Sequence, residues 1–178
     1  MPGDIDMAKY RILKLPLPTD DQEAASKKYH DDNLPPGGYT EGARVYHDAP
    51  QAIPDNTWTD LAFNSERWDT DVIHDVAVNN SRLTCRTAGV YAIVFHGNFA
   101  AHAVGARQFL LFSNLQGNIG MVQLGLSAFN VFATSVATIL DLAVDEFLYV
   151  EVYQNSGGPL NIEFDAQYTP EFMMQRIG

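Results

Sequence analysis

In His47-Asp48 and in His74-Asp75 a histidine stands directly before an aspartate. Such a pair could supply general acid–base catalysis, because imidazole and carboxylate are common proton-transfer groups in enzymes. Neighbouring residues of a strand, however, point to opposite faces, and no recognisable nucleophile motif accompanies either pair. We therefore predict two surface pairs and no enzymatic activity.

The segment around the second pair also holds candidate metal ligands, namely Asp69, Asp71, His74 and Asp75. Calcium takes oxygen ligands of this kind, but the segment lacks the regular spacing and the glycine of a helical calcium loop. We predict no cofactor, and a divalent cation such as calcium is the alternative.

Trp58 and Trp68 flank a polar stretch and could each offer a stacking platform to a sugar, although a tryptophan more often closes a core. The single cysteine, Cys85, has no partner for an internal disulfide. Its place beside Leu83 in an alternating segment predicts a buried structural thiol.

The charge balance and the lengths of the apolar runs argue against two classes of partner. The chain has 22 acidic and 11 basic residues, a net charge of -11. Proteins that bind nucleic acid through its phosphates depend on lysine and arginine, so we expect no nucleic-acid partner. No apolar run approaches the roughly 20 residues of a spanning helix, so we expect no membrane insertion.

The composition changes near residue 40, since all four lysines precede that point. We predict two modules, an N-terminal arm over residues 1–40 and a head domain over residues 41–178. In the arm, N-cap candidates and acidic residues after Pro18 predict one short helix over about 19–33. Pro35-Pro36-Gly37-Gly38 then forms a linker.

After residue 43 the sequence consists of short apolar or alternating runs separated by turn residues, which predicts an all-β sandwich. Residues 160–168 alternate cleanly, as expected for an outer strand with one face in water. Residues 90–100, 147–153 and 172–177 carry apolar or aromatic residues on both faces, as expected for strands of an inner sheet. Because both faces of such a sheet need cover, we infer a homo-oligomer. Cover by loops or by the N-terminal segment is the alternative.

A series of motifs in this order resembles the globular heads of the complement-1q and tumour-necrosis-factor superfamily, in the version found in bacteriophage structural proteins. The motifs are Ala43-Arg44-Val45-Tyr46-His47, Asn56-Thr57-Trp58-Thr59, Phe63-Asn64-Ser65-Glu66-Arg67-Trp68-Asp69-Thr70, Ser81-Arg82-Leu83-Thr84, Ala88-Gly89-Val90-Tyr91, Val152-Tyr153-Gln154-Asn155-Ser156-Gly157-Gly158 and Pro170-Glu171-Phe172-Met173-Met174. The resemblance implies a ten-stranded jelly roll that forms a homotrimer with its inner sheet round the threefold axis. The predicted contacts near that axis are Val94, Phe147, Tyr149, Tyr153 and Met173.

The segment from Leu17 to Tyr29 is similar to one that recurs in phage tail-fibre and related virion proteins. Unlike collagen-bearing members of the superfamily, the chain has no Gly-X-Y stalk. The similarity implies attachment of the arm to other virion proteins of a capsid or tail. The predicted attachment residues are Thr19, Asp20, Lys27, Lys28 and Tyr29.

These resemblances lead to a functional hypothesis. We expect a bacteriophage structural protein on the virion surface, whose trimeric head contacts a glycan or protein of the host surface. A purely architectural role in decorating the capsid or fibre, without receptor binding, is the alternative.

Overall fold

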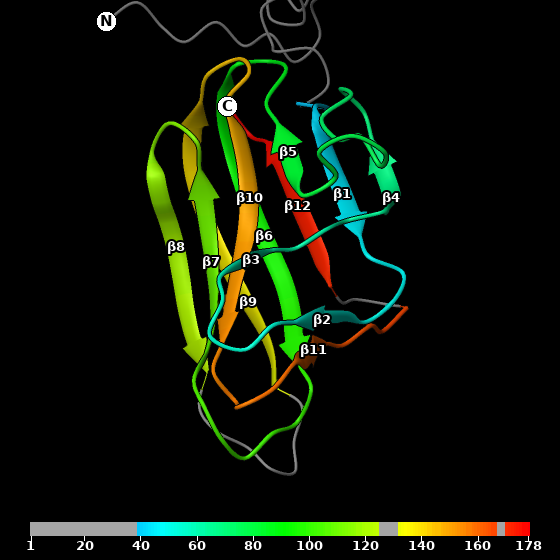
Figure 1. Ribbon diagram of the computed structural model, residues 1–178. Coiled ribbons are helices and arrows are strands. Elements are labelled where there is room, and N and C mark those ends of the chain that lie inside the picture. Colours follow the sequence, from blue (N-terminus) through cyan, green and yellow to red (C-terminus); the bar gives the residue numbers. More distant parts are fainter. Residues whose placement is uncertain (1–38, 125–131, 167–169) are drawn as a thin grey trace, which may run out of the picture. The chain divides into compact units, whose positions relative to one another are not determined.

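The computed structural model describes residues 39–124, 132–166 and 170–178, and these residues form a two-layer antiparallel β sandwich (Figure 1). The described part contains twelve strands and no helix. The prediction of an all-β fold is therefore confirmed. The predicted arm with its helix over 19–33 lies outside the described residues, and within them no helix is long and apolar enough to cross a bilayer.

Seven strands form the first layer, sheet A. They are β1 (Gly42–Tyr46), β2 (Gln51–Ile53), β4 (Ser65–Asp69), β6 (Gly89–Phe99), β9 (Phe132–Leu142), β11 (Leu160–Ile162) and β12 (Glu171–Arg176). Five strands form the second layer, sheet B. They are β3 (Thr59–Asp60), β5 (Arg82–Thr84), β7 (Arg107–Ser113), β8 (Gly117–Leu124) and β10 (Phe147–Gln154).

The core lies between the two sheets, and buried and outward side chains alternate along most of β6 and all of β10. In β6, for example, Ile93 and Phe95 are fully buried, whereas Val94 between them points outward. The rings of Phe95 and Phe99 in sheet A lie 5.1 and 5.0 Å from that of Phe109 in sheet B, so aromatic contacts join the two layers. Burial of these rings supplies a large share of the hydrophobic stabilisation.

Three details of the strand predictions are wrong. Residues 147–153 belong to the opposite sheet from residues 90–100, because β10 pairs with β7 and β5 and not with β6. The outer strand predicted over 160–168 ends at Ile162 and pairs with β6 in sheet A. The described part has twelve strands instead of the ten that the resemblance implied, since short pairings such as that of β2 with β11 add to the sandwich.

Candidate functional site

Strand β10 presents one set of side chains to the core and another to the outer surface of sheet B. Its core side is fully buried and, apart from Gln154 at the end of the strand, aliphatic, as at Val150 and Val152. The outward set is only partly buried. It comprises Phe147, Tyr149, Glu151 and Tyr153.

Pairing with three other strands places charged and aromatic groups beside this outward set. Tyr149 has Arg82 of β5 opposite it on one side and Phe112 of β7 on the other. Glu151 lies directly opposite Asp60 of β3. Together with these residues, Asn114 and Phe147 line an open pocket of about 360 Å³, which we call the β10 pocket.

Aromatic rings form much of the wall of the β10 pocket. The ring of Tyr149 lies 5.2 Å from that of Phe112 and 6.2 Å from that of Phe147, in tilted arrangements typical of favourable ring pairs. The guanidinium carbon of Arg82 stands 4.1 Å from the centre of the Phe147 ring, a cation–π contact. The pocket therefore combines apolar ring surface with a positive charge.

Two carboxylates face each other across the same pocket. Partial burial raises the pKa of Asp60, which the nearby Arg82 charge partly offsets. Partial burial and the neighbouring Asp60 charge raise the pKa of Glu151. None of the side chains of Asp60, Arg82 and Glu151 makes a hydrogen bond or a close ion pair with any residue that the structure describes. Their donors and acceptors are thus available to a ligand.

The aromatic surface continues beyond the pocket along β10. The ring of Trp58 lies 5.2 Å from that of Tyr153, and the Tyr153 hydroxyl donates to Asn56 Oδ1 at 3.1 Å. Trp58 is 44 % exposed and Trp68 is 38 % exposed, so the expectation that these tryptophans close the core is wrong. Trp58 precedes β3, a strand of only two residues in sheet B, and Trp68 lies on β4 at an edge of sheet A.

The structure divides the five predicted trimer contacts between two faces. Phe147, Tyr149 and Tyr153 lie on the outer face of sheet B, whereas Val94 and Met173 are cross-strand partners on the outer face of sheet A. The two groups are therefore on opposite sides of the sandwich, with the core between them. One threefold axis cannot pass beside both.

The outer face of sheet A carries a row of small and aliphatic side chains. Ala92 faces Ile139 and Val94 faces Ala137 across the β6–β9 pairing, and Met173 adjoins Val94 from β12. Ile139 is 63 % exposed although it lies in the middle of a long strand. We call these five residues the sheet A row.

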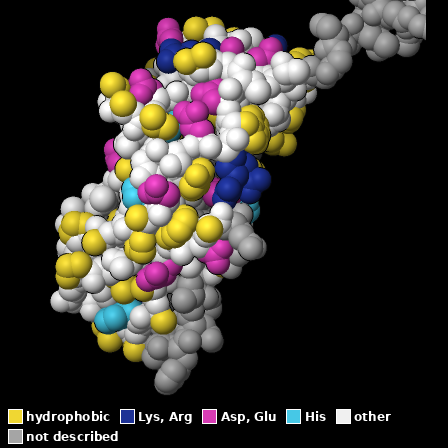
Figure 2. Space-filling view, turned by 90° about the vertical axis from the view of Figure 1, so that its right-hand side faces the viewer, with side chains coloured by type: hydrophobic (Ala, Val, Ile, Leu, Met, Phe, Trp, Pro, Cys, Tyr) yellow, Lys and Arg dark blue, Asp and Glu magenta, His cyan; other side chains and the backbone are white. Residues whose placement is uncertain are grey.

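The same face holds an ion cluster around Glu171, whose side chain is fully buried. Its carboxylate accepts hydrogen bonds from Arg44 Nε at 2.7 Å and from Arg67 Nε at 2.5 Å. The guanidinium of Arg67 also stacks over Tyr46 at 4.6 Å. In Figure 2 the basic side chains gather in compact groups, while acidic side chains are spread over the surface. All described basic side chains other than histidine are arginines, so each group can hold its carboxylate partners in a fixed fork geometry.

The second acid–base candidate, His74-Asp75, has a structural role. His74 is only 6 % exposed, so the prediction of a surface pair is wrong there. Its ring lies 2.9 Å from Glu66 through Nδ1 and 3.2 Å from the Asn80 carbonyl through Nε2. Asp69 and Asp75 accept hydrogen bonds from backbone amides of their own loop, which orders the turn between β4 and β5.

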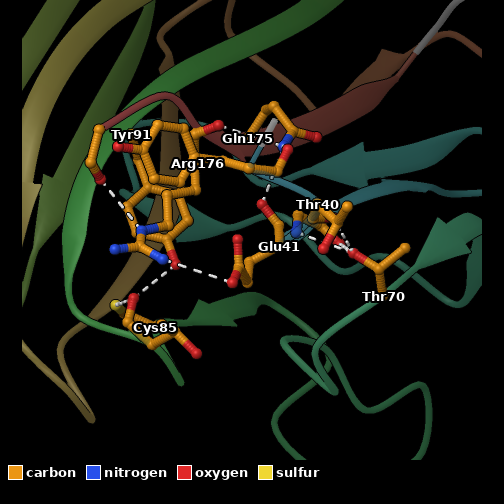
Figure 3. A network of polar contacts seen from close by, with 11 residues as sticks. Thr40, Glu41, Thr70, Cys85, Tyr91, Gln175 and Arg176 are labelled. Atoms are coloured by element: carbon orange, nitrogen blue, oxygen red, sulfur yellow. Dashed lines mark hydrogen bonds and ion pairs between the residues drawn. The ribbon is translucent and has the colours of Figure 1, made fainter. Parts of the chain in front are cut away.

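Cys85 is fully buried, which confirms the prediction of a structural thiol. Burial raises the pKa of the thiol, and both its Sγ and the Tyr91 hydroxyl donate to the Thr87 carbonyl. Figure 3 shows this group beside a polar network that joins the start of β1 to the C-terminal strand. In that network the Arg176 guanidinium donates to the Glu41 carboxylate, and the Gln175 side chain donates to the Glu41 carbonyl. These side-chain contacts connect the residue before β1 to β12.

Five residues that line the β10 pocket were not predicted from the sequence as site residues, namely Asp60, Arg82, Phe112, Asn114 and Glu151. Asp60, Arg82 and Phe112 are far from Tyr149 in the sequence and reach it only through strand pairing. Glu151 was a usable signal, because it is the one charge on a strand otherwise apolar on both faces. The predicted attachment residues Thr19, Asp20, Lys27, Lys28 and Tyr29 lie outside the described residues.

No protein-family model and no curated protein matches the chain. Solved structures do match it. The globular domain of zebrafish complement 1qA protein is 16% identical with a TM-score of 0.58, and the match covers 78% of this chain and 98% of that one. Murine APRIL at pH 5.0 is 8% identical with a TM-score of 0.59, over 76% of this chain and 98% of that one. Eiger TNF from S. frugiperda is 10% identical with a TM-score of 0.55, over 79% and 94%. The described head therefore has the jelly-roll fold of complement-1q and tumour-necrosis-factor domains.

Proposed function

We propose that the chain is a non-enzymatic binding protein whose head forms a homotrimer through the outer face of sheet A. The observation that carries this proposal is the sheet A row, an apolar strip in which Ile139 is 63 % exposed. Exposed apolar surface of this kind on a sandwich indicates a face that another layer covers. A second copy of the same chain is the simplest source of that layer.

The electrostatics of the two faces support this choice. On sheet A the central carboxylate, Glu171, is already paired with two arginines and can be covered at little further cost. On sheet B the carboxylates of Asp60 and Glu151 have raised pKa values and no close ion pair among the described residues. Covering them with another copy would leave buried charges without partners. We therefore assign Val94 and Met173 to the contact, and Phe147, Tyr149 and Tyr153 to a surface that stays open.

Light scattering of the purified full chain at micromolar concentration tests the trimer. The expected mass is about three times the chain mass of 19.7 kDa. The substitution Ile139→Asp should lower that mass, because it places an unpaired charge within the contact. Val144→Asp is the matched control, since Val144 is 55 % exposed in the turn before β10 and lies outside the sheet A row.

Tyr149→Asp is the second arm of the same experiment and should leave the trimer intact. If it dissociates the trimer while Ile139→Asp does not, the contact lies on sheet B and our assignment of the face is wrong. A wild-type chain that stays monomeric at micromolar concentration refutes the trimer itself.

We propose further that this trimer is a bacteriophage virion protein. In this proposal the arm attaches the head to a capsid or tail through Thr19, Asp20, Lys27, Lys28 and Tyr29, and the head contacts a glycan or protein of the host surface. Three copies would raise a weak single-site affinity by avidity. The support is the tail-fibre-like segment together with the jelly-roll head. Electron microscopy of virions labelled with an antibody against the head tests the location, and absence of label from purified particles would refute it.

A further inference from the structure

We propose that the β10 pocket, together with the Trp58–Tyr153 surface beside it, is a binding site for a neutral oligosaccharide. The inference deepens the proposed function, because it rests on the role of the head in contacting a host surface and names the ligand class and the site. It starts from the groups that line the pocket and from their charges.

The mixture of charges in the pocket selects against strongly charged ligands of either sign. Asp60 and Glu151 face each other across the β3–β10 pairing and would repel an anionic sugar. Arg82 lines the same pocket, with its guanidinium over the Phe147 ring, and would repel a lysine or arginine side chain. A neutral ligand that both donates and accepts hydrogen bonds suits all three groups.

Sugar hydroxyls are such groups. A carboxylate can accept from two neighbouring hydroxyls, and a guanidinium can donate to a hydroxyl or ring oxygen in a fixed fork geometry. The described residues leave the side chains of Asp60, Arg82 and Glu151 without a hydrogen bond, so these groups need not break an internal hydrogen bond to bind. The partial burial that raises the pKa of both carboxyls makes hydrogen bonds to them stronger than in bulk water.

The aromatic rings provide the second half of the recognition. Pyranose rings present a face of C–H bonds that packs on aromatic side chains, and partly exposed Phe112 and Tyr149 offer such surfaces in the pocket. Tyr153, on the same face of β10 and four residues from Tyr149, contacts the exposed Trp58. Four residues of strand span about 13 Å, more than one pyranose ring needs. The site therefore fits a short chain of sugar units.

Binding of the full chain to immobilised oligosaccharides tests this proposal. The probes are neutral hexasaccharides of glucose, mannose, galactose and N-acetylglucosamine, with heparin oligosaccharides and oligolysine as charged comparisons. At least one neutral probe should bind. Tyr149→Ala and Glu151→Gln should each weaken that binding by roughly tenfold, as expected for loss of a stacked ring or of a charge-assisted hydrogen bond.

Gln123→Ala is the matched control, because Gln123 lies exposed on the outer face of the same sheet and its side chain bonds only Gln108 among the residues that the structure describes. Its binding should equal that of the wild type. Binding that the two pocket variants leave unchanged overturns the proposal. Binding that is confined to heparin or oligolysine also overturns the proposal. The same holds if no neutral probe binds at millimolar concentration.

Light scattering on the same samples separates this inference from the proposed function. If the protein is a trimer but binds no neutral probe, the oligosaccharide proposal is wrong and the trimer proposal is retained. If the protein is a monomer whose binding depends on Tyr149, the trimer proposal is wrong and the oligosaccharide proposal is retained.

Discussion

Replacing Glu151 with glutamine should stabilise the protein at neutral pH. Glu151 and Asp60 stand directly opposite each other in the β3–β10 pairing, and like charges at such positions weaken a sheet. Cross-strand pairs contribute roughly 0.2–1 kcal/mol, and both side chains keep some contact with water, so we expect a gain of about 0.5 kcal/mol at pH 7.5. Glutamine keeps the shape of the side chain, so the packing against Tyr149 should not change.

The gain should depend on pH in a defined direction. The folded-state pKa of each carboxyl is raised above its ordinary value of 3.8 for Asp60 or 4.5 for Glu151. A raised pKa means that the folded state binds the proton more tightly than the unfolded state, so each ionised carboxyl costs stability at neutral pH. That cost disappears as the pH falls through the raised pKa toward the ordinary value. The advantage of Glu151→Gln should therefore be full at pH 7.5 and close to zero at about pH 4.

Urea unfolding followed by far-ultraviolet circular dichroism, at one protein concentration, measures this difference. A double-mutant cycle with Asp60→Asn isolates the repulsion, since the gain from Glu151→Gln should shrink when Asp60 is already neutral. The reasoning is refuted if Glu151→Gln lowers the free energy of unfolding at pH 7.5. It is also refuted if the gain is the same with and without the Asp60 charge.

Three further predictions concern stability and reactivity. Glu171→Ala should lower the free energy of unfolding by about 2–3 kcal/mol, because it removes the buried partner of Arg44 and Arg67; an unchanged urea midpoint would contradict this. Gly105→Ala should cost at least about 1 kcal/mol, since φ is +87° and a Cβ would clash with the backbone of Asn155 in the loop after β10; an unaltered melting temperature would contradict this. The thiol of Cys85, fully buried with a raised pKa, should react with Ellman's reagent only after unfolding, and rapid native-state labelling would contradict its placement.

Alternation along single strands was predictable from the sequence, and the assignment of strands to sheets was not. The buried and outward residues of 90–100 and of 147–153 follow the period of two that a strand imposes. That period says nothing about which strand lies alongside, because pairing between distant segments is set by packing of the whole sandwich. Residues 147–153 were therefore placed in the wrong sheet, although their faces were divided correctly.

The β10 pocket could not be predicted from the sequence for the same reason, because it depends on which strands pair. Arg82 lies in a three-residue strand and Asp60 in a two-residue strand, which are too short to show any periodicity. Only their registers with β10 bring them to Tyr149 and Glu151. The sequence around Trp58 does not separate an exposed platform from a core position, and the structure leaves its side chain 44 % exposed beside Tyr153.

Symmetry helps to decide between the two explanations of a strand that is apolar on both faces. Aromatic residues outside the core fit either a contact between copies or a platform for a ligand, and sequence composition does not separate these. A threefold axis beside Tyr149, however, would bring three copies of Asp60 and Glu151 together, six carboxylates against three copies of Arg82. The sheet A row brings together uncharged side chains instead, beside a Glu171 that two arginines already neutralise. Because repulsion among like charges grows as water is excluded, this comparison favours placing the proposed axis beside sheet A and the proposed ligand on the aromatic face of β10.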